Sequence, residues 1–272
     1  MKEYLDKIKN ELRLRGFADN TIESYVLHNK KFFEFINKKP LDVNEDDIKS
    51  FLSALIEKKL SAASLALVRS ALKFYYEELL GRNIFRTIKT PKKQRKLPDV
   101  LTKEEVTKLI DSTKHKKSRL IISLLYSSGL RVSEALNLKM QDVDLHEKVG
   151  YVRQGKGKKD RIFILSDKLA LELEDYLKNK KRDEHLFPGK DGKMTSRNVQ
   201  KMIRKTAKRA GINKKVSPHT LRHSYGTHLL ENGVDIRKIQ MLLGHSQLST
   251  TQLYTQVSTE ELKKIKSPFD DL

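Results

Sequence analysis

The N-terminal third of the chain has apolar side chains at the spacing of amphipathic helices and shows no strand-like alternation. The first apolar stripe, which predicts the first helix, consists of Tyr4, Leu5, Ile8 and Leu12. A second stripe predicts a helix over 21–36, with Asp19 or Asn20 as its N-cap. Two more helices are expected over 46–60 and 64–80. This part of the chain is therefore expected to form an all-helical domain.

From Leu101 onward the sequence again predicts helices. Thr102-Lys-Glu-Glu105 is a capping box that opens a helix. The apolar run 118–128 predicts a second helix, which ends in a left-handed cap at Gly129. Another helix is expected over 196–210.

Two short strands interrupt these helices. Residues 150–154 and 161–165 have strand-like composition and flanking turn residues. The connection between them, Gly155-Lys-Gly-Lys-Lys159, is a basic turn with two glycines. The second domain is therefore expected to be mixed α/β with a small antiparallel sheet.

The segment between the two domains, residues 86–99, reads RTIKTPKKQRKLPD, and no residue in it is expected to join a core. Its composition is typical of a linker, which gives domains over 1–85 and 100–272. We expect this linker to follow a phosphate backbone, although the alternative is a charge run that is merely solvated. Its cations between Pro91 and Pro98 are Lys92, Lys93, Arg95 and Lys96.

Composition narrows the class of partner. The 272 residues include 56 Lys and Arg against 35 Asp and Glu, a formal net charge of +21. Such a surplus favours a polyanion, because each neutralised phosphate releases condensed counterions. The alternative is a basic soluble protein without such a partner. The absence of cysteine excludes disulfides and thiolate zinc sites. The sequence shows neither the apolar core of a signal peptide nor an apolar stretch long enough to span a membrane. We therefore expect a cytoplasmic protein with no membrane partner.

Candidate chemistry begins at a strong helix start. Ser217 is a suitable N-cap, and Pro218 suits the first helical position. His219 then lies in the first turn, where free N–H groups and the helix dipole attract anions. Arg222 is three residues further on and shares that face of the helix.

The same region continues with a histidine and a tyrosine. A helix is expected to end at Gly244, which delivers His245, and Tyr254 follows nine residues later on another short helix. Each histidine alone is explained as an ordinary polar residue at a helix end. Taken together and in this order along the chain, the two histidines, Arg222 and Tyr254 are better explained by phosphoryl transfer through a covalent tyrosine ester.

A metal site is the competing interpretation of the histidines. His219 and His223 are four residues apart, and His228 is near. An HExxH pattern is absent, and no Asp or Glu lies within 217–230. We therefore expect no metal and no cofactor, with His223 packed behind Arg222 as a supporting residue.

A tyrosine hydroxyl, with an unperturbed pKa of about 10, attacks a phosphate only if that phosphate is strongly activated. Two arginines can clamp its non-bridging oxygens and remain charged. Arg222 is one, and Arg131, fixed just after the helix stop at Gly129, is the best second candidate.

The departing 5′ oxygen needs a proton, which a lysine on a turn can supply. Lys156 lies between Gly155 and Gly157 and fits this role. Lys158 and Lys159 compete for it and are otherwise expected to contact the DNA backbone.

At these residues the chain resembles the tyrosine recombinase (phage integrase) family, and within it the Xer-type site-specific recombinases. The first part resembles the family's N-terminal DNA-clamping domain at Gly16–Tyr25 and Ser70–Tyr75, and Lys96-Leu-Pro98 with Leu101–Glu105 resembles its domain junction. The catalytic pattern stands here as Gly129-Leu-Arg-Val-Ser-Glu134, Gly155-Lys-Gly157, His219-Thr-Leu-Arg222, Gly244-His245 and Tyr254.

The resemblance implies a two-domain, mainly α fold: a helical SAM-like core-binding domain and a mixed α/β catalytic domain with a small antiparallel sheet. It implies that Tyr254 cleaves double-stranded DNA through a 3′-phosphotyrosyl link, and that two rounds of exchange pass through a Holliday junction. The implied roles are phosphate binding by Arg131 and Arg222, proton transfer by His219, a hydrogen bond from His245, general acid catalysis by Lys156, and support from Glu134.

The resemblance also implies a tetramer on two DNA sites, in which a C-terminal helix over about 259–266 docks on a neighbour. One departure is Tyr254-Thr-Gln256, where many relatives have Tyr-Thr-His. The chain is too short for the arm-binding domain of many phage integrases, which favours resolution of chromosome or plasmid dimers. The alternatives are an integrase of a mobile element, a type IB topoisomerase-like enzyme, and a non-catalytic architectural DNA-binding protein.

Overall fold

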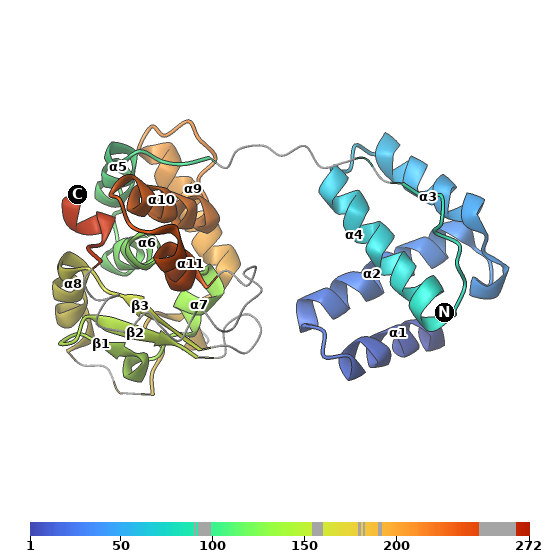
Figure 1. Cartoon of the computed structure of the whole chain (residues 1–272), viewed down its shortest axis with the longest axis horizontal. Helices are drawn as coiled ribbons and strands as arrows, with labels where there is room; N and C mark the ends of the chain where they lie inside the picture. The colour runs from blue at the N-terminus through green and yellow to red at the C-terminus, as the bar shows by residue number, and fades with distance from the viewer. Residues whose placement is uncertain are drawn as a thin grey trace. The chain divides into compact units, whose positions relative to one another are not determined.

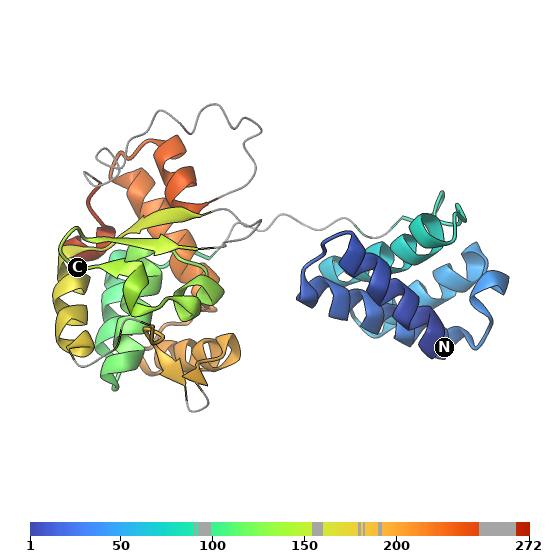
Figure 2. The same ribbon diagram turned by 90° about the horizontal axis from the view of Figure 1, so that it is seen from below.

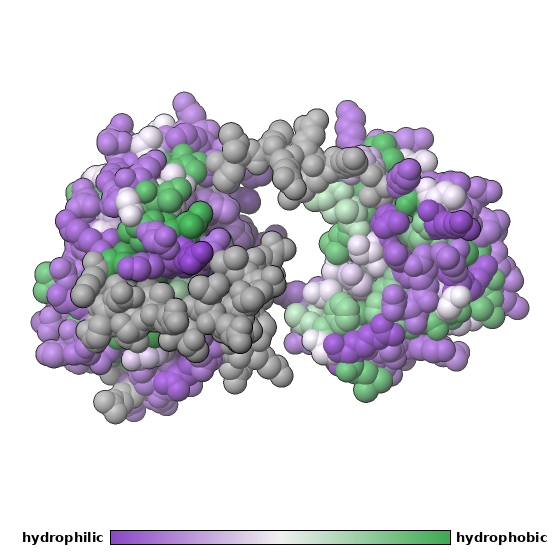
Figure 3. Space-filling view, in the orientation of Figure 1, coloured by the Kyte–Doolittle hydropathy of each residue, from purple (hydrophilic) through white to green (hydrophobic). Residues whose placement is uncertain are grey.

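The computed structural model describes residues 1–89, 91, 99–153, 160–178, 181, 183–189, 192–244 and 265–272. The chain divides into two compact units, Met1–Lys96 and Leu97–Leu272, each built around its own hydrophobic core (Figure 1). Hydrophilic residues cover most of the face of both units that Figure 3 shows. In the described parts of the chain, no helix is long and apolar enough to cross a membrane.

The first unit is helical, as its apolar pattern predicts. Its elements are α1 (Lys2–Leu14), α2 (Asp19–Ile36), the 3-10 turn η1 (Pro40–Asp42), α3 (Glu45–Glu57) and α4 (Ala62–Lys73), which continues as a π-helical turn, η2 (Phe74–Leu79). The expected N-cap of α2 is wrong. Ala18 occupies that position with an extended backbone, and its carbonyl accepts the amide of Ile22. Asp19 instead lies in the first turn, where its charge still favours the helix dipole.

The core of the first unit is rich in aromatic rings packed edge to face. Phe32 meets Tyr76 at a centroid distance of 6.1 Å, and Phe33 meets Tyr75 at 5.4 Å. Ile88 is buried in the same core, and Nε of Arg69 donates a hydrogen bond to its carbonyl at 2.9 Å. The expectation that residues 86–99 contribute nothing to a core is therefore wrong at Ile88, which is apolar enough to fill a place beside α4.

The second unit is mixed α/β. Its helices are α5 (Lys103–Asp111), α6 (Lys116–Ser128), α7 (Val132–Asn137), α8 (Asp167–Leu177), α9 (Ser196–Arg209), α10 (Pro218–Glu231) and α11 (Ile236–Leu243), with 3-10 turns η3 (Met140–Asp142) and η4 (Pro268–Asp271). Its strands are β1 (Val143–Asp144), β2 (Val149–Val152), β3 (Arg161–Ile164), β4 (Pro188–Gly189) and β5 (Gly192–Lys193). The order β1-β2-β3 is antiparallel throughout, and β4 pairs with β5.

Helix α6 lies in the middle of this unit, where it packs against α5, α8, α10 and β3 (Figures 1 and 2). This position explains why its residues from Leu120 to Ser128 are all buried. The strand register places Val152 opposite Arg161 at the end of β2 and β3 that adjoins residues 154–159.

The local signals for helix ends in this unit are confirmed. Thr102 and Glu105 exchange capping-box hydrogen bonds at 3.2 and 2.8 Å. Ser217 accepts the amide of Thr220 at the start of α10. Gly129 ends α6 in the left-handed region, at φ 59°, and a Cβ there would lie 2.5 Å from the Tyr225 ring, so both conformation and space require glycine.

The last residues of the chain pack on their own unit. The Phe269 side chain is fully buried and meets the Tyr126 ring edge to face at 6.2 Å. Ser267 donates a hydrogen bond to the carbonyl of Ser127, and Asp270 accepts the amide of Lys168. The helix expected over 259–266 lies outside the described residues except for its last two positions.

Candidate active site

The turn between α6 and α7 fixes Arg131 by its own helix. Arg131 is the N-cap of α7, and its amide donates to Oε2 of Glu134, three residues later, at 2.7 Å. Its Nη1 donates to Oε1 of the same carboxylate at 2.7 Å, and its Nη2 donates to the carbonyl of Gly244 at 3.0 Å. The Arg131 side chain remains 23% exposed. Glu134 therefore supports Arg131 by direct contact, and one edge of the guanidinium is left for a ligand.

Arg222 reaches the same place from the buried face of α10. Its Nη1 donates to the carbonyl of Gly129 at 2.6 Å, and its Nη2 donates to the carbonyl of Leu243. Both acceptors are uncharged, and no carboxylate of the described residues forms an ion pair with Arg222. The structure thus brings the two predicted arginines together, because α10 packs on α6 and α11 so that Gly129 and Leu243 flank one side chain.

A third arginine, Arg161 at the start of β3, joins this cluster and was not predicted from the sequence. Its side chain is only 13% exposed, and its Nη2 donates to Oε2 of Glu134 at 2.7 Å. The only sequence signal for it was its place directly after the basic turn, at the first position of a strand. We call Arg131, Arg161, Arg222 and Glu134 the arginine cluster.

The arginine cluster carries a surplus of positive charge, because it contains three guanidiniums and one carboxylate, which pairs with Arg131 and Arg161. Burial lowers the pKa of Arg222 to about 10, and the positive charge of Arg131 contributes to this shift. Burial also lowers the pKa of Arg161, against the attraction of Glu134. Arginine side chains stay protonated in proteins, so the cluster keeps its positive charge. Buried cations without full neutralisation favour an incoming anion, and the planar fork of arginine matches the oxygens of a phosphate.

The two predicted histidines of α10, His219 and His223, are both exposed, which was not expected of His223. His219 lies in the first turn of α10 and is exposed, where it is open to a ligand. His223 is also exposed, so the expectation that it packs behind Arg222 is wrong. Successive helical residues point about 100° apart, since a turn takes about 3.6 residues, so His223 turns outward where Arg222 turns inward.

The remaining predicted site residues lie outside the described part of the chain. These are Lys156, His245 and Tyr254, together with Lys92, Lys93, Arg95, Lys96, Lys158 and Lys159. The structure describes their chain neighbours: Gly244 immediately before His245, and β2 and β3 on either side of the turn that contains Lys156.

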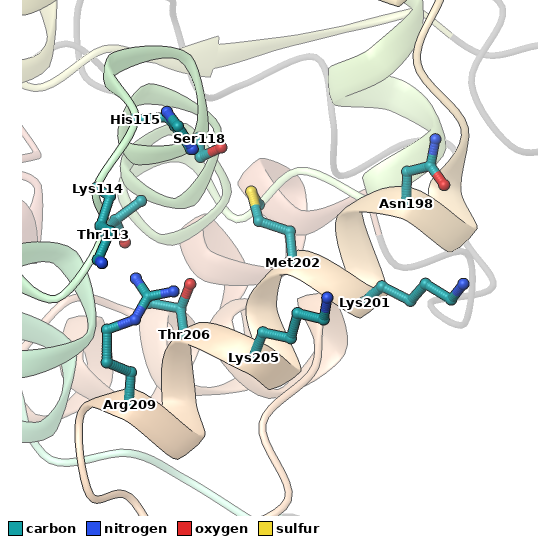
Figure 4. Close-up of a pocket in the computed structure, with 10 residues that line it drawn as sticks. All are labelled: Thr113, Lys114, His115, Ser118, Asn198, Lys201, Met202, Lys205, Thr206 and Arg209. Atoms are coloured by element: carbon teal, nitrogen blue, oxygen red, sulfur yellow. The ribbon is translucent and has the colours of Figure 1, made fainter.

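A second basic surface lies on α9. All its cations are exposed, and the helix has no acidic residue. Together with residues 113–115 and with Ser118 in the first turn of α6, it lines a pocket of about 360 Å³, and Lys205 and Arg209 are among the α9 residues that line this pocket (Figure 4). This surface was not predicted from the sequence, although its signal is present there: the cations of α9 are Arg197, Lys201, Arg204, Lys205, Lys208 and Arg209.

The histidines do not form a metal-binding group in the described residues, where no cluster of three or more His, Cys, Asp or Glu could hold an ion. His228, which entered the metal alternative, is buried, and its Nδ1 lies 2.7 Å from the Tyr126 hydroxyl. Its ring is therefore already engaged in the core.

Comparison with known proteins adds a family to this geometry. The sequence model of the Phage integrase family matches residues 99–261, and that of the "Phage integrase, N-terminal SAM-like domain" matches residues 4–85. The chain is a tyrosine recombinase of the phage integrase family. This membership confirms the expected fold class, a SAM-like helical domain followed by a mainly helical catalytic domain with small antiparallel sheets.

Tyrosine recombinases of the Xer type match nearly the whole length of this tyrosine recombinase. It is 40% identical to the tyrosine recombinase XerA of Pyrococcus horikoshii over 267 residues, which cover 96% of this chain and 92% of the relative. It is 37% identical to the tyrosine recombinase XerD of Staphylococcus haemolyticus over 292 residues, covering 99% and 97%. A solved structure of XerH site-specific recombinase bound to difH substrate, in a pre-cleavage complex, has a TM-score of 0.68 and 27% identity, covering 95% and 82%.

Proposed function

We propose that this tyrosine recombinase is a site-specific DNA recombinase that cleaves and rejoins strands through a 3′-phosphotyrosyl intermediate and a Holliday junction. The observation that carries the proposal is the arginine cluster: Arg131 and Arg222 converge from two helices, and one carboxylate leaves their charge unbalanced. A phosphodiester reduces that imbalance, because it brings one negative charge and two non-bridging oxygens to the open edges of the guanidiniums.

In the proposed reaction, the Tyr254 oxygen forms a bond to phosphorus, and the bond from phosphorus to the 5′ oxygen breaks. The tyrosine loses its proton with help from His219, and Lys156 protonates the departing 5′ oxygen. His245 donates a hydrogen bond to the phosphate. Each preorganised donor contributes about 2.7–4 kcal/mol to such a step, by analogy with removal of oxyanion-hole donors.

The 5′ hydroxyl of a partner strand reverses the step, so the energy of the phosphodiester is conserved in the tyrosyl ester. No nucleotide hydrolysis is required by this scheme, and the arginine cluster supplies positive charge of the kind that a metal ion supplies elsewhere. We accordingly propose cleavage that needs no cofactor.

The proposed polymer is double-stranded DNA, as in the XerH complex with difH substrate. The exposed cationic face of α9 supports this proposal, because a helix with six cations and no acid is suited to phosphate backbones. The basic segment 86–99 and the residues Lys158 and Lys159 are proposed as further backbone contacts.

We also propose a tetramer on two DNA sites, with residues from about 259 onward exchanged between neighbours. Residues 265–272 dock on their own unit here through Phe269, which identifies a receptor surface between Tyr126 and Lys168 for such a segment. A neighbour's segment is chemically identical and fits the same surface. The proposed role is the resolution of chromosome or plasmid dimers, with integration of a mobile element and DNA relaxation as alternative outcomes.

The test is covalent trapping on DNA. The full chain is incubated with genomic fragments in excess chelator, proteins are denatured, and the DNA ends of surviving adducts are mapped. We expect adducts at a small number of sequences, and none with Tyr254→Phe, which should still bind DNA because only a hydroxyl is lost. Adducts that persist in Tyr254→Phe, or that require added Mg²⁺ or Zn²⁺, contradict the proposed chemistry. Exchange between two duplexes, scored on the mapped site, separates recombination from relaxation of a single duplex.

A further inference from the structure

Arg161 connects three segments that the proposed reaction uses. It begins β3, two positions after the segment 154–159 that includes Lys156 and lies outside the described residues. Its Nη2 shares Oε2 of Glu134 with the backbone amide of Arg131. Its side chain also lies against Gly244, where a Cβ would come within 2.6 Å of the Arg161 Nε.

This contact explains the glycine that precedes His245. Gly244 adopts φ 61° at the end of α11, and the Arg161 side chain fills the space that a larger residue would need. The carbonyl of Gly244 then accepts the Nη2 of Arg131. The Arg161 side chain thus restricts the position of Gly244, the residue before His245, and the Arg131 guanidinium holds the carbonyl of Gly244.

The buried position of Arg161 is not explained by packing alone. Its Nε and Nη1 are buried and have no hydrogen-bond partner among the residues that the structure describes. An unpaired buried donor opposes folding, and an apolar side chain of similar length would avoid that cost. A function that needs the charge accounts for an arginine here.

The charge of Arg161 is needed to balance the carboxylate of Glu134. With Arg131 as its only cation, Glu134 would neutralise the very guanidinium that is proposed to bind phosphate. Arg161 takes a share of the same carboxylate at the same distance, 2.7 Å, so Arg131 keeps more of its positive charge for a ligand.

We propose that Arg161 is a positioning residue of the recombinase: it balances Glu134 so that Arg131 remains free to stabilise the scissile phosphate, and it fixes Gly244 beside it. Its buried Nε and Nη1 exclude a direct contact with DNA from those atoms. The inference rests on the proposed function, because it assigns Arg161 a part in stabilising that phosphate.

The experiment measures single-turnover cleavage of a nicked duplex that carries a genomic site mapped with the unchanged chain. The short strand released at the nick diffuses away, so the adduct accumulates. Two substrates are compared: one with the ordinary scissile phosphate, and one with a methylphosphonate there, which carries no negative charge. The variants are Arg161→Met and Arg161→Lys, with Arg119→Met as the matched control, since Arg119 forms an exposed ion pair with Glu172 in the same unit.

We expect Arg161→Met to cleave the ordinary substrate about 100-fold more slowly, the low end for loss of one preorganised electrostatic donor. DNA affinity should be unchanged, and Arg161→Lys should recover part of the rate because a lysine can still share the carboxylate. On the methylphosphonate the penalty for Arg161→Met should fall below about 10-fold, because no phosphate charge remains to be stabilised.

Equal penalties on the two substrates would reduce Arg161 to a structural residue and overturn the proposal, as would a rate equal to that of Arg119→Met. Because the comparison is made within one variant, a loss of folded protein affects both substrates alike and cancels. If the unchanged chain forms no adduct on any fragment, it is the proposed function that fails, and the two failures are therefore distinct.

Discussion

Replacing Glu134 with glutamine removes the only carboxylate of the arginine cluster while keeping the shape of the side chain. The carboxylate accepts three hydrogen bonds of 2.7 Å, from the amide and Nη1 of Arg131 and from Nη2 of Arg161. A glutamine offers one acceptor oxygen, and its NH₂ group then faces a donor. The cluster also becomes three cations with no counter-charge. Glu134→Gln should therefore destabilise the catalytic unit.

The size of the effect follows from the burial of the Glu134 side chain, which is 7% exposed. Removal of one partner from a buried ion pair costs about 3–5 kcal/mol, and the retained amide oxygen places Glu134→Gln near about 3 kcal/mol. Such a loss is a large fraction of the ~5–15 kcal/mol that separates folded and unfolded states of a typical protein.

The pH dependence of this loss has a definite sign. Burial acts to raise the pKa of Glu134, but the charge of Arg161 and the hydrogen bonds and charge of Arg131 outweigh it, so the pKa is lowered on folding. A carboxylate with a lowered pKa stabilises the fold above its unfolded pKa of about 4.3, and this contribution is lost as the pH falls through the folded value. The difference between wild type and Glu134→Gln should therefore be full at pH 7 and narrow below about pH 4.

The assay is urea unfolding of the full chain, followed by far-UV circular dichroism because the chain has no tryptophan. Glu172→Gln is the control, since its ion pair with Arg119 is longer, at 3.8 Å, and more exposed. That change should cost less than about 1 kcal/mol. Sulfate should stabilise Glu134→Gln more than wild type, because the uncompensated cluster binds an anion more tightly. A difference that is the same at pH 7 and pH 3, or no larger than that of the control, would refute the assigned role of Glu134.

Two further predictions concern segments that lie wholly or partly outside the described residues. Lys156→Ala should slow cleavage, and a substrate with a 5′-bridging sulfur, whose leaving group needs no proton, should largely restore the rate; if the mutant cleaves both substrates at one rate, Lys156 is only a backbone contact. Deletion of residues 259–272 should leave binding to a single DNA site nearly intact and impair synapsis and strand exchange, whereas recombination at the full-length rate would exclude the tail as the coupling element.

The features that the sequence predicted well are those that depend on neighbouring residues. The capping box at Thr102, the cap at Ser217 and the left-handed stops at Gly129 and Gly244 are confirmed, because each is determined within a few residues. The convergence of two arginines was predicted from the chemistry of phosphate activation and from the family pattern, and it is explained by the packing of α10 against α6 and α11.

The features that were missed depend on contacts between distant segments. No local pattern indicates that Arg161 turns inward to Glu134, 27 residues earlier in the chain. The burial of Ile88 and Phe269 is likewise decided by the surfaces that receive them, since neither belongs to an amphipathic repeat. The error at His223 has a local origin. His223 was expected to pack behind Arg222, although neighbouring residues of a helix point about 100° apart.

The segment that contains Tyr254 is anchored at both ends on the same unit. At one end, Arg131 holds the carbonyl of Gly244. At the other, Ser267 is bonded to α6 and Phe269 is buried beside it. Only ten residues separate Tyr254 from Ile265, a reach of at most about 40 Å when fully extended. If the tail moves to the same receptor surface on a neighbour, its anchor moves while the arginine cluster stays in place. The proposed exchange of tails would therefore change the constraint on the nucleophile itself, so that assembly and cleavage become coupled through a short length of chain.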